Sequence, residues 1–159
     1  ASTGGFTDVM LRRGAIRVVA VDVGRDQLHP SLRADSRVMS LEGTDLRALS
    51  GETVGFAAAL VSVDVSFISL RLVLPALAAL SAPGAALVAL IKPQFEAGRE
   101  RIGRGGIVRD EAVHAAVCAE IRRFIEGLGF QILGLIPSPV EGGDGNREFL
   151  IGARKLSHV

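Results

Sequence analysis

The sequence predicts an α/β fold with a mostly parallel, doubly wound sheet and an antiparallel last strand, and three observations lead to it. Residues 85–91 form a continuous apolar run, typical of a strand buried on both faces of a parallel sheet. This strand ends in Lys92 and an earlier apolar strand ends in Asp64, at the edge where open α/β sheets bind ligands. The last two strands are joined by a segment rich in proline and glycine, where no helix fits, so we expect them to pair antiparallel.

The composition fits one globular domain. A chain of 159 residues can bury a sizeable core, and 48% hydrophobic residues exclude a disordered chain. The single cysteine, Cys118, excludes an intrachain disulfide and fits a reducing, cytoplasmic compartment. A net charge of +1 gives no bulk attraction to nucleic acid. No apolar run reaches the ~18 residues needed to span a bilayer, so no membrane partner is expected.

The first element is a glycine-rich turn, Gly4–Gly5, followed by a helical pattern over residues 6–13. Such glycines let a ligand approach the backbone, although an ordinary turn also uses them. The first strand, residues 18–22, ends in Asp22, 17 residues after Gly5. An acidic strand end about 20 residues after the glycines binds a ribose hydroxyl pair in dinucleotide-binding folds. A helix cap or a solvated strand end is the alternative for Asp22.

Residues 24–33 predict a turn and a short helix, in which His29 is given no role, and residues 37–41 predict a short edge strand. The polar loop 42–45 follows. In this topology the loop lies beside a bound nucleobase, so Asp45 is expected either to accept from an exocyclic amine or to cap the next turn. The sequence does not decide between these two roles.

The second buried strand is expected at residues 57–64, ahead of a helix that extends to residue 80. Its N-cap is expected to be Ser66 or Ser69. Pro75 is expected to kink this helix or to mark its first turn.

Pro83-Gly84 predicts a turn before the strand that ends in Lys92. Pro93 has no N–H to donate, so strand pairing is expected to stop there. Taken alone, Lys92 could mark a strand end with its stem on apolar surface and its amine in water.

Residues 93–109 form a loop too long for a plain connection. Such a mobile basic loop over a strand-end site is suited to gripping phosphates. A solvated flap is the alternative because Glu96 and Glu100 dilute the charge, and we favour substrate contact. The loop holds four glycines and four arginines: Arg99, Arg101, Arg104 and Arg109.

The clearest helix follows Asp110, its expected N-cap. Cys118 lies beside its apolar face and is expected in the core, whereas His114 falls off that face and is expected to be exposed. The last strands are expected at residues 130–136 and 148–153. The apolar face recurs at steps of three and four residues and consists of Val113, Val117, Ile121, Phe124, Ile125 and Leu128.

Asp64, Lys92 and Glu148 are expected to converge, because two strands end in the first two and the final strand begins with the third. Two carboxylates can hold a lysine amine and tune its proton affinity. A lysine must lose its proton before it acts as a base, and acids alone oppose that loss, so a further cation is expected nearby. The sequence shows no His/Cys ligand set, so no metal is expected.

Five stretches together resemble one family, the TlyA (hemolysin) branch of the FtsJ-like RNA methyltransferases. They are Ala-Ser-Thr-Gly-Gly-Phe-Thr-Asp (1–8), Val-Ala-Val-Asp-Val-Gly (19–24), Asp-Val-Ser-Phe-Ile-Ser-Leu (64–70), Leu-Ile-Lys-Pro-Gln-Phe-Glu (90–96) and Gly-Asn-Arg-Glu-Phe (145–149). The resemblance covers essentially the whole chain. It implies a Rossmann-like fold that binds S-adenosylmethionine and methylates ribose 2′-hydroxyls of ribosomal RNA through a Lys-Asp-Lys-Glu tetrad.

Site roles follow from the resemblance by matching motifs. Asp64, Lys92 and Glu148 would be the last three tetrad members, with Lys92 taking or orienting the hydroxyl proton. The glycine turn would line the methionine part of S-adenosylmethionine, Asp22 its ribose and Asp45 its adenine. The implied cofactor contacts are Ser2, Gly4, Gly5, Asp22, Val23, Asp45 and Asp64.

The chain departs from the family at its amino end. It lacks the S4-like RNA-binding domain, the segment with the first tetrad lysine, and the opening strand, which would be central in the order 3-2-1-4-5-7-6. We therefore expect residues 1–159 to be a methyltransferase-domain fragment that binds cofactor weakly and is inactive alone. Unpaired strand edges would favour pairing with another copy.

Three other functions compete with the methyltransferase hypothesis. A nicotinamide-dependent dehydrogenase also uses glycines and a strand-end acid, but it does not explain Asp64 together with Lys92. A cell-lysing protein fits the older family name, but the chain shows no membrane segment or strongly amphipathic basic helix. A non-enzymatic RNA-binding protein is the third alternative.

Overall fold

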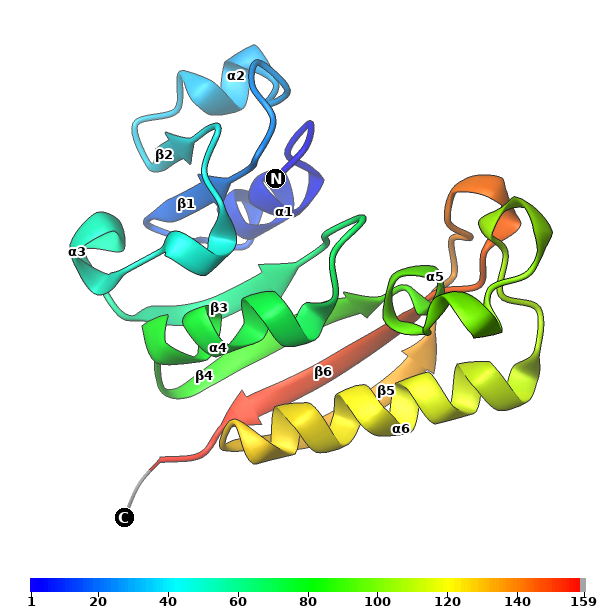
Figure 1. The fold of residues 1–159 in the computed structure, drawn as a ribbon. Coiled ribbons are helices and arrows are strands. Elements are labelled where there is room, and N and C mark those ends of the chain that lie inside the picture. Colours follow the sequence, from blue (N-terminus) through cyan, green and yellow to red (C-terminus); the bar gives the residue numbers. More distant parts are fainter. Residues whose placement is uncertain (158–159) are drawn as a thin grey trace. The chain divides into compact units, whose positions relative to one another are not determined.

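The computed structural model describes residues 1–157 and divides the chain into two compact units, Ala1–Phe56 and Ala57–Val159. Each unit has its own sheet, with order β1-β2 in the first and β3-β4-β6-β5 in the second (Figure 1). The predicted α/β class is confirmed. The expected order 3-2-1-4-5-7-6, read without its strand 1, gives the same two runs of strands.

The first unit is a parallel strand pair with short helices. β1 and β2 pair in parallel from Val18↔Val38 to Val21↔Leu41. His29, which had no predicted role, caps α2 by accepting a hydrogen bond from the Ser31 N–H. The elements of the unit are α1 (Gly5–Arg12), β1 (Val18–Val21), α2 (Pro30–Arg33), β2 (Val38–Leu41), the 3₁₀ turn η1 (Leu46–Ala48) and α3 (Gly51–Val54).

The second unit is built on four strands, of which β6 alone runs in the opposite direction. The predicted antiparallel pairing of the last two strands is confirmed. Alternate residues of β4 are buried on one face, whereas the residues between them are only half-buried, so burial on both faces was overestimated. The strands are β3 (Ala58–Val63), β4 (Ser81–Ile91), β5 (Phe130–Pro137) and β6 (Phe149–Lys155).

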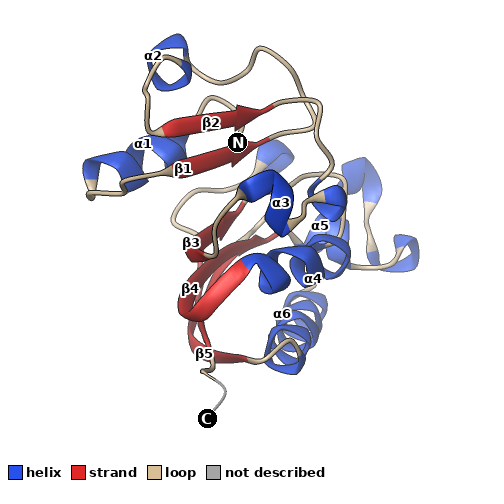
Figure 2. Cartoon of the chain, turned by 90° about the vertical axis from the view of Figure 1, so that its left-hand side faces the viewer, coloured by secondary structure: helices blue, strands red, loops and turns tan. Residues whose placement is uncertain are grey.

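Helices α4 and α6 cover the buried face of this sheet (Figures 1 and 2). The predicted caps are confirmed, because Ser69 accepts from the Arg71 N–H and Asp110 accepts from the Ala112 N–H. Pro75 lies inside α4 rather than in its first turn. The remaining elements are α4 (Leu70–Leu80), α5 (Pro93–Glu96), α6 (Glu111–Gly127) and the 3₁₀ turns η2 (Arg99–Arg101), η3 (Arg104–Gly106) and η4 (Gly143–Gly145).

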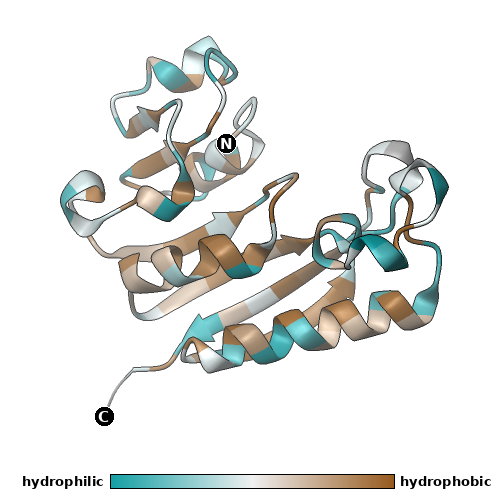
Figure 3. Ribbon diagram, in the orientation of Figure 1, coloured by the Kyte–Doolittle hydropathy of each residue, from teal (hydrophilic) through white to brown (hydrophobic). Residues whose placement is uncertain are grey.

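The core of the second unit lies between these helices and the sheet. Figure 3 shows the strands mostly in apolar colours and polar residues interspersed along α6. The side chains buried there include Leu70, Leu74, Leu87, Ile91, Val117, Ile121, Ile125 and Ile151.

Two strand predictions need correction. Pro83-Gly84 is not a separate turn but part of β4, where the register with β3 shifts between Ser81 and Ala86 and Gly84 has φ +76°. Strand β3 lies at the edge of its sheet and is mostly not buried, since Leu60 is 44% exposed.

Two further predictions need correction. The long loop predicted at residues 93–109 contains three short helices, α5, η2 and η3. His114 is buried rather than exposed, since its Nε2 lies 2.9 Å from the Val108 carbonyl oxygen and its ring contacts Phe149 edge-on. Cys118 is buried as predicted. None of the helices within residues 1–157 is both long and apolar enough to cross a membrane.

Candidate functional site

The carboxyl edge of the second sheet holds an ion pair. Asp64 directly follows β3 and Lys92 directly follows β4, so the parallel pairing of these strands brings the two residues together. The Lys92 Nζ lies 2.8 Å from Asp64 Oδ1 and donates to Ser66 Oγ at 3.0 Å. The Lys92 side chain is 13% exposed and that of Asp64 is 44% exposed. The predicted pairing of these two residues is therefore present.

Glu148 reaches the same edge but has a different partner. The register Ile91↔Phe149 places it beside the end of β4. Its carboxylate is nearly fully buried and accepts a hydrogen bond from Gln94 Nε2 at 3.1 Å. Among residues 1–157, Glu148 forms no ion pair with Lys92, so the expected lysine between two acids is only half assembled.

The short helix α5, which follows Lys92, contacts the segment between Asp64 and α4. The Phe95 ring packs against Phe67 with centroids 4.9 Å apart. The Glu96 carboxylate accepts from Ser69 Oγ at 2.6 Å and from the Leu70 N–H at 2.7 Å. Burial is the largest influence on the pKa of Glu96 and raises it, against the opposing effect of these hydrogen bonds. On the sequence alone, Glu96 counted only as a charge that dilutes the basic loop, and no partner was predicted for it.

Phe67 is an exposed aromatic residue near this ion pair. Its side chain is 89% exposed and its φ is +62°. A bulky residue in the left-handed region is uncommon and costs on the order of 1–3 kcal/mol, and such residues gather at functional sites. The signal available in the sequence was an aromatic residue three positions after a strand-end acid, between Ser66 and the predicted cap Ser69.

The basic segment, residues 99–109, is called the arginine loop here. Its backbone is anchored by Asn146, which is buried. Asn146 Oδ1 accepts from the Val108 N–H at 3.1 Å, and its Nδ2 donates to the Gly106 carbonyl oxygen at 3.2 Å. These hydrogen bonds attach the loop to the segment before β6 at residues 106 and 108, so its backbone is not free there.

The arginines of the loop differ in their partners. Arg101 lies 3.8 Å from Glu100 and 3.9 Å from Glu120. Within residues 1–157, the other three form no ion pair and are exposed: Arg99, Arg104 and Arg109. The loop therefore presents three guanidinium groups to solvent.

In the first unit, Asp22 connects the glycine turn to the end of β1. Its carboxylate accepts from the Ser2 N–H at 2.6 Å, the Gly24 N–H at 2.8 Å and the Ala1 amino group at 2.8 Å. Partial burial alone raises the pKa of Asp22, but these hydrogen bonds outweigh it and lower the pKa to about 2. Asp22 is therefore ionised at neutral pH.

The two turn glycines have different reasons to be glycine. Gly4 has φ +104°, which disfavours any side chain, and a Cβ there would lie 2.4 Å from the end of the Leu32 side chain. A Cβ at Gly5 would meet nothing within 4 Å. Open space at Gly5 fits the predicted approach of a ligand to the backbone. Val23, another predicted contact, is 74% exposed.

Asp45 has the capping role that the sequence offered as one alternative. It accepts from the Arg47 N–H at 2.8 Å at the start of η1 and pairs with the Arg47 guanidinium. The Arg47 hydrogen bonds lower the pKa of Asp45 to about 2. Contact with an adenine amine stays a prediction.

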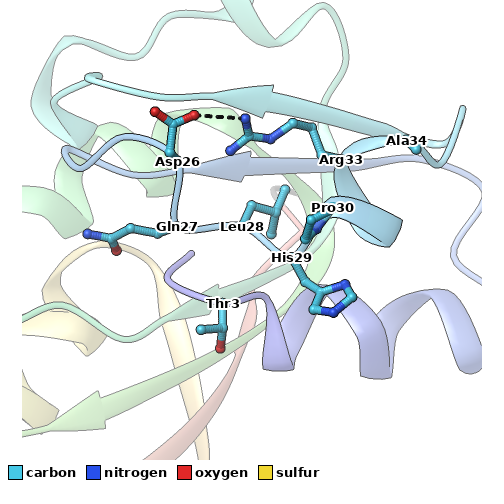
Figure 4. Close-up of a pocket in the computed structure, with 8 residues that line it drawn as sticks. All are labelled: Thr3, Asp26, Gln27, Leu28, His29, Pro30, Arg33 and Ala34. Carbon is cyan, nitrogen blue, oxygen red and sulfur yellow. Dashed lines mark hydrogen bonds and ion pairs between the residues drawn. The ribbon is translucent and has the colours of Figure 1, made fainter.

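The first unit also has a surface hollow of about 640 Å³ beside the glycine turn (Figure 4). Arg33 donates to Asp26 Oδ1 at 3.0 Å within it. Thr3 lines it, but none of the predicted cofactor residues does. The lining residues are Thr3, Asp26, Gln27, Leu28, His29, Pro30, Arg33 and Ala34.

The described residues, 1–157, contain no group of three or more His, Cys, Asp or Glu side chains that could hold a metal ion. Burial raises the pKa of Cys118 to about 11. Its thiol therefore stays protonated at neutral pH, which fits a core residue rather than a nucleophile.

The parallel strand pairs β1-β2 and β3-β4, with a Lys-Asp pair at the strand ends, define an α/β protein of the kind that binds ligands where parallel strands end. The family profile of the FtsJ-like methyltransferases matches residues 1–155, and the chain belongs to this family.

Relatives agree with this assignment. The chain is 47% identical over 154 residues to the 16S/23S rRNA (cytidine-2′-O)-methyltransferase TlyA of Mycobacterium tuberculosis, covering 97% of this chain and 58% of the relative. It therefore spans little more than half the length of that relative. A hemolysin-like protein from Streptococcus thermophilus superposes with TM-score 0.94 at 50% identity, covering 99% of this chain and 57% of that one.

A more distant structure shows the fold alone. An N1-methyltransferase from Burkholderia thailandensis, solved with S-adenosylhomocysteine, superposes with TM-score 0.66 at 18% identity, covering 98% of this chain and 69% of that one.

Proposed function

We propose that this chain is the catalytic domain of an S-adenosylmethionine-dependent methyltransferase that acts on a ribose 2′-hydroxyl of ribosomal RNA. The observation that carries the proposal is the 2.8 Å pair between Lys92 and Asp64 at the carboxyl edge of the second sheet. It occurs in a member of the FtsJ-like family with a relative named for cytidine 2′-O-methylation.

The first unit has groups suited to the methyl donor. S-adenosylmethionine supplies a methyl group already activated by its sulfonium. Open space at Gly5 lets the backbone approach the methionine part, beside Ser2 and Gly4. The ionised carboxylate of Asp22 suits a ribose hydroxyl pair. Val23 and Asp45 would contact the adenine side.

The second unit has the group that handles the hydroxyl. Lys92 would orient the 2′-hydroxyl, or accept its proton once Nζ has given up its own. The oxygen would bond to the methyl carbon as the carbon–sulfur bond of the donor breaks and S-adenosylhomocysteine leaves. Asp64 fixes the position of Nζ, and Glu148 contributes a second acid at the same edge. Because the methyl group is already activated, catalysis rests mainly on alignment of oxygen, carbon and sulfur.

The RNA is held by contacts on the second unit. The exposed ring of Phe67 suits stacking with a nucleobase, which would place its ribose near Lys92. The three unpaired guanidinium groups of the arginine loop suit contacts with backbone phosphates.

Replacement of the lysine tests the proposal. In a form extended at the amino end, we expect Lys92→Ala to abolish transfer of labelled methyl groups to ribosomal RNA while the protein stays folded, because no other described group pairs with Asp64. The chain has one other lysine, Lys155, whose Nζ bonds the carbonyl oxygens of Ala78 and Ser81. Lys155→Ala is the matched control and should keep methylation in its folded fraction.

Unchanged methylation by Lys92→Ala would refute the assigned role. Titration with S-adenosylhomocysteine, in this chain and in a form extended at the amino end, separates cofactor binding from catalysis.

A further inference from the structure

The segment that carries Asp64 is fixed at its two ends. At one end, Val63 pairs with Ala89 in the sheet. At the other end, α4 begins at Leu70 with Ser69 as its cap. The residues between them include the 44% exposed carboxylate of Asp64 and the 89% exposed ring of Phe67. Their position relative to Lys92 therefore depends on how these ends are held.

Glu96 holds the second end. Each of its carboxylate oxygens accepts one hydrogen bond, Oε2 from Ser69 Oγ at 2.6 Å and Oε1 from the Leu70 N–H at 2.7 Å. A carboxylate at this place also complements the positive end of the α4 dipole. Because Glu96 lies four residues after Lys92, these bonds connect the lysine segment directly to the aspartate segment.

We propose that Glu96 is a positioning residue, which holds residues 64–69 so that Asp64 and Phe67 face Lys92. The inference rests on the proposed methyltransferase function. A role in helix capping alone is the competing explanation. It is weakened because Ser69 already caps α4, with its Oγ accepting from the Arg71 N–H at 3.1 Å. The helix therefore keeps one cap when Glu96 is replaced, and the variants are expected to fold.

A fluorescent reporter tests the position without any need for activity. The chain has no Trp or Tyr, so Phe67→Trp introduces a single indole on the segment in question. We expect Glu96→Ala in this background to lower the fluorescence anisotropy of the indole and to increase its quenching by acrylamide. Glu96→Gln keeps one acceptor oxygen and should give an intermediate change.

Asp110→Ala is the control variant, because it removes the side-chain cap of α6. It should lower stability and leave the reporter unchanged. Equal anisotropy and quenching in the Glu96 variants and their parent would overturn the proposal.

Activity gives the second readout. Loss of alignment by about 1 Å can cost about 100-fold in rate. We therefore expect Glu96→Ala to lower kcat by up to that factor with little change in the KM for S-adenosylmethionine. A purely structural role would leave kcat of the folded fraction unchanged. If the parent protein, in a form extended at the amino end, transfers no methyl group, the proposed function fails, while the reporter still decides whether Glu96 holds the segment.

Discussion

Phe67 and Asp22 are single residues whose surroundings differ from what their types ordinarily prefer. Phe67 is exposed and has a positive φ, although a phenylalanine usually avoids both. Asp22 is partly buried yet strongly acidic, because the charged Ala1 amino group and the N–H groups of Ser2 and Gly24 bond its carboxylate. The positive φ of Phe67 and the partial burial of the Asp22 carboxylate each cost free energy, which other contacts must offset. We therefore expect substitutions at both residues to have measurable effects.

Phe67→Leu is expected to weaken RNA binding and methylation. Stacking of a base on an aromatic ring contributes about 1–3 kcal/mol, and leucine keeps the bulk but not the flat face. Binding to a short ribosomal RNA fragment measures the effect. Phe56→Leu is the control, since Phe56 lies under Arg17 in the first unit. Equal RNA affinity for Phe67→Leu and the parent would count against stacking.

The acid limb of the stability curve is expected to depend on Asp22. Its folded pKa is about 2, below the ~3.9 of an unfolded aspartate, so its stabilisation is full above about pH 4 and is lost as pH falls through about 2. Asp22→Asn should flatten the fall in unfolding free energy over this range and weaken S-adenosylhomocysteine binding.

Asp35 provides the comparison for Asp22, because hydrogen bonds from Arg37 also lower its pKa to about 2. Asp35→Asn should flatten the acid limb and leave ligand binding intact. If the two variants bind S-adenosylhomocysteine equally well, Asp22 has no ligand role.

At the scale of elements, short segments determine the site more than long ones do. Helix α5 has four residues, yet Lys92 precedes it, Gln94 bonds Glu148 and Glu96 bonds the start of α4. The arginine loop is likewise held by one side chain, Asn146, at two backbone positions. The basic surface is thus attached to the segment that leads into Glu148.

Arginine substitutions in the loop test the phosphate contacts. Each of Arg99→Ala, Arg104→Ala and Arg109→Ala should weaken RNA binding and reduce the salt dependence of log K by about 0.7–0.9 per lost contact. Arg101→Ala should have a smaller effect, because Glu100 and Glu120 already lie within 4 Å of its guanidinium. An unchanged salt slope for all four variants would show that the loop does not contact phosphate.

Local sequence pattern predicted the elements better than the contacts between them. The positions of Asp64 and Lys92 follow from where apolar runs stop, and the caps at Ser69 and Asp110 from residue type. The burial of His114 depends on a hydrogen bond to Val108, which comes from outside its helix and leaves no periodic signal. The bonds from Gln94 to Glu148 and from Asn146 to Gly106 of the arginine loop likewise join positions 54 and 40 residues apart.

At the scale of the molecule, the chain has two sheets rather than one. Within residues 1–157, β1 pairs only with β2, and β3 pairs only with β4. In the expected order, strand 1 would lie between the strands that correspond to β1 and β3. Each of these two strands therefore has one edge that pairs with no strand within residues 1–157. Pairing of these edges with another copy stays a prediction, because a free edge is a template for a further strand.

The single thiol at Cys118 has a practical consequence for these experiments. It is buried on α6 of the second unit, and its pKa of about 11 keeps it unreactive while that unit is closed. Modification of the thiol by an aromatic disulfide reagent therefore counts openings of the second unit alone, with no background from another sulfhydryl group. The rate of Cys118 modification therefore measures how often the second unit opens, whatever the first unit binds.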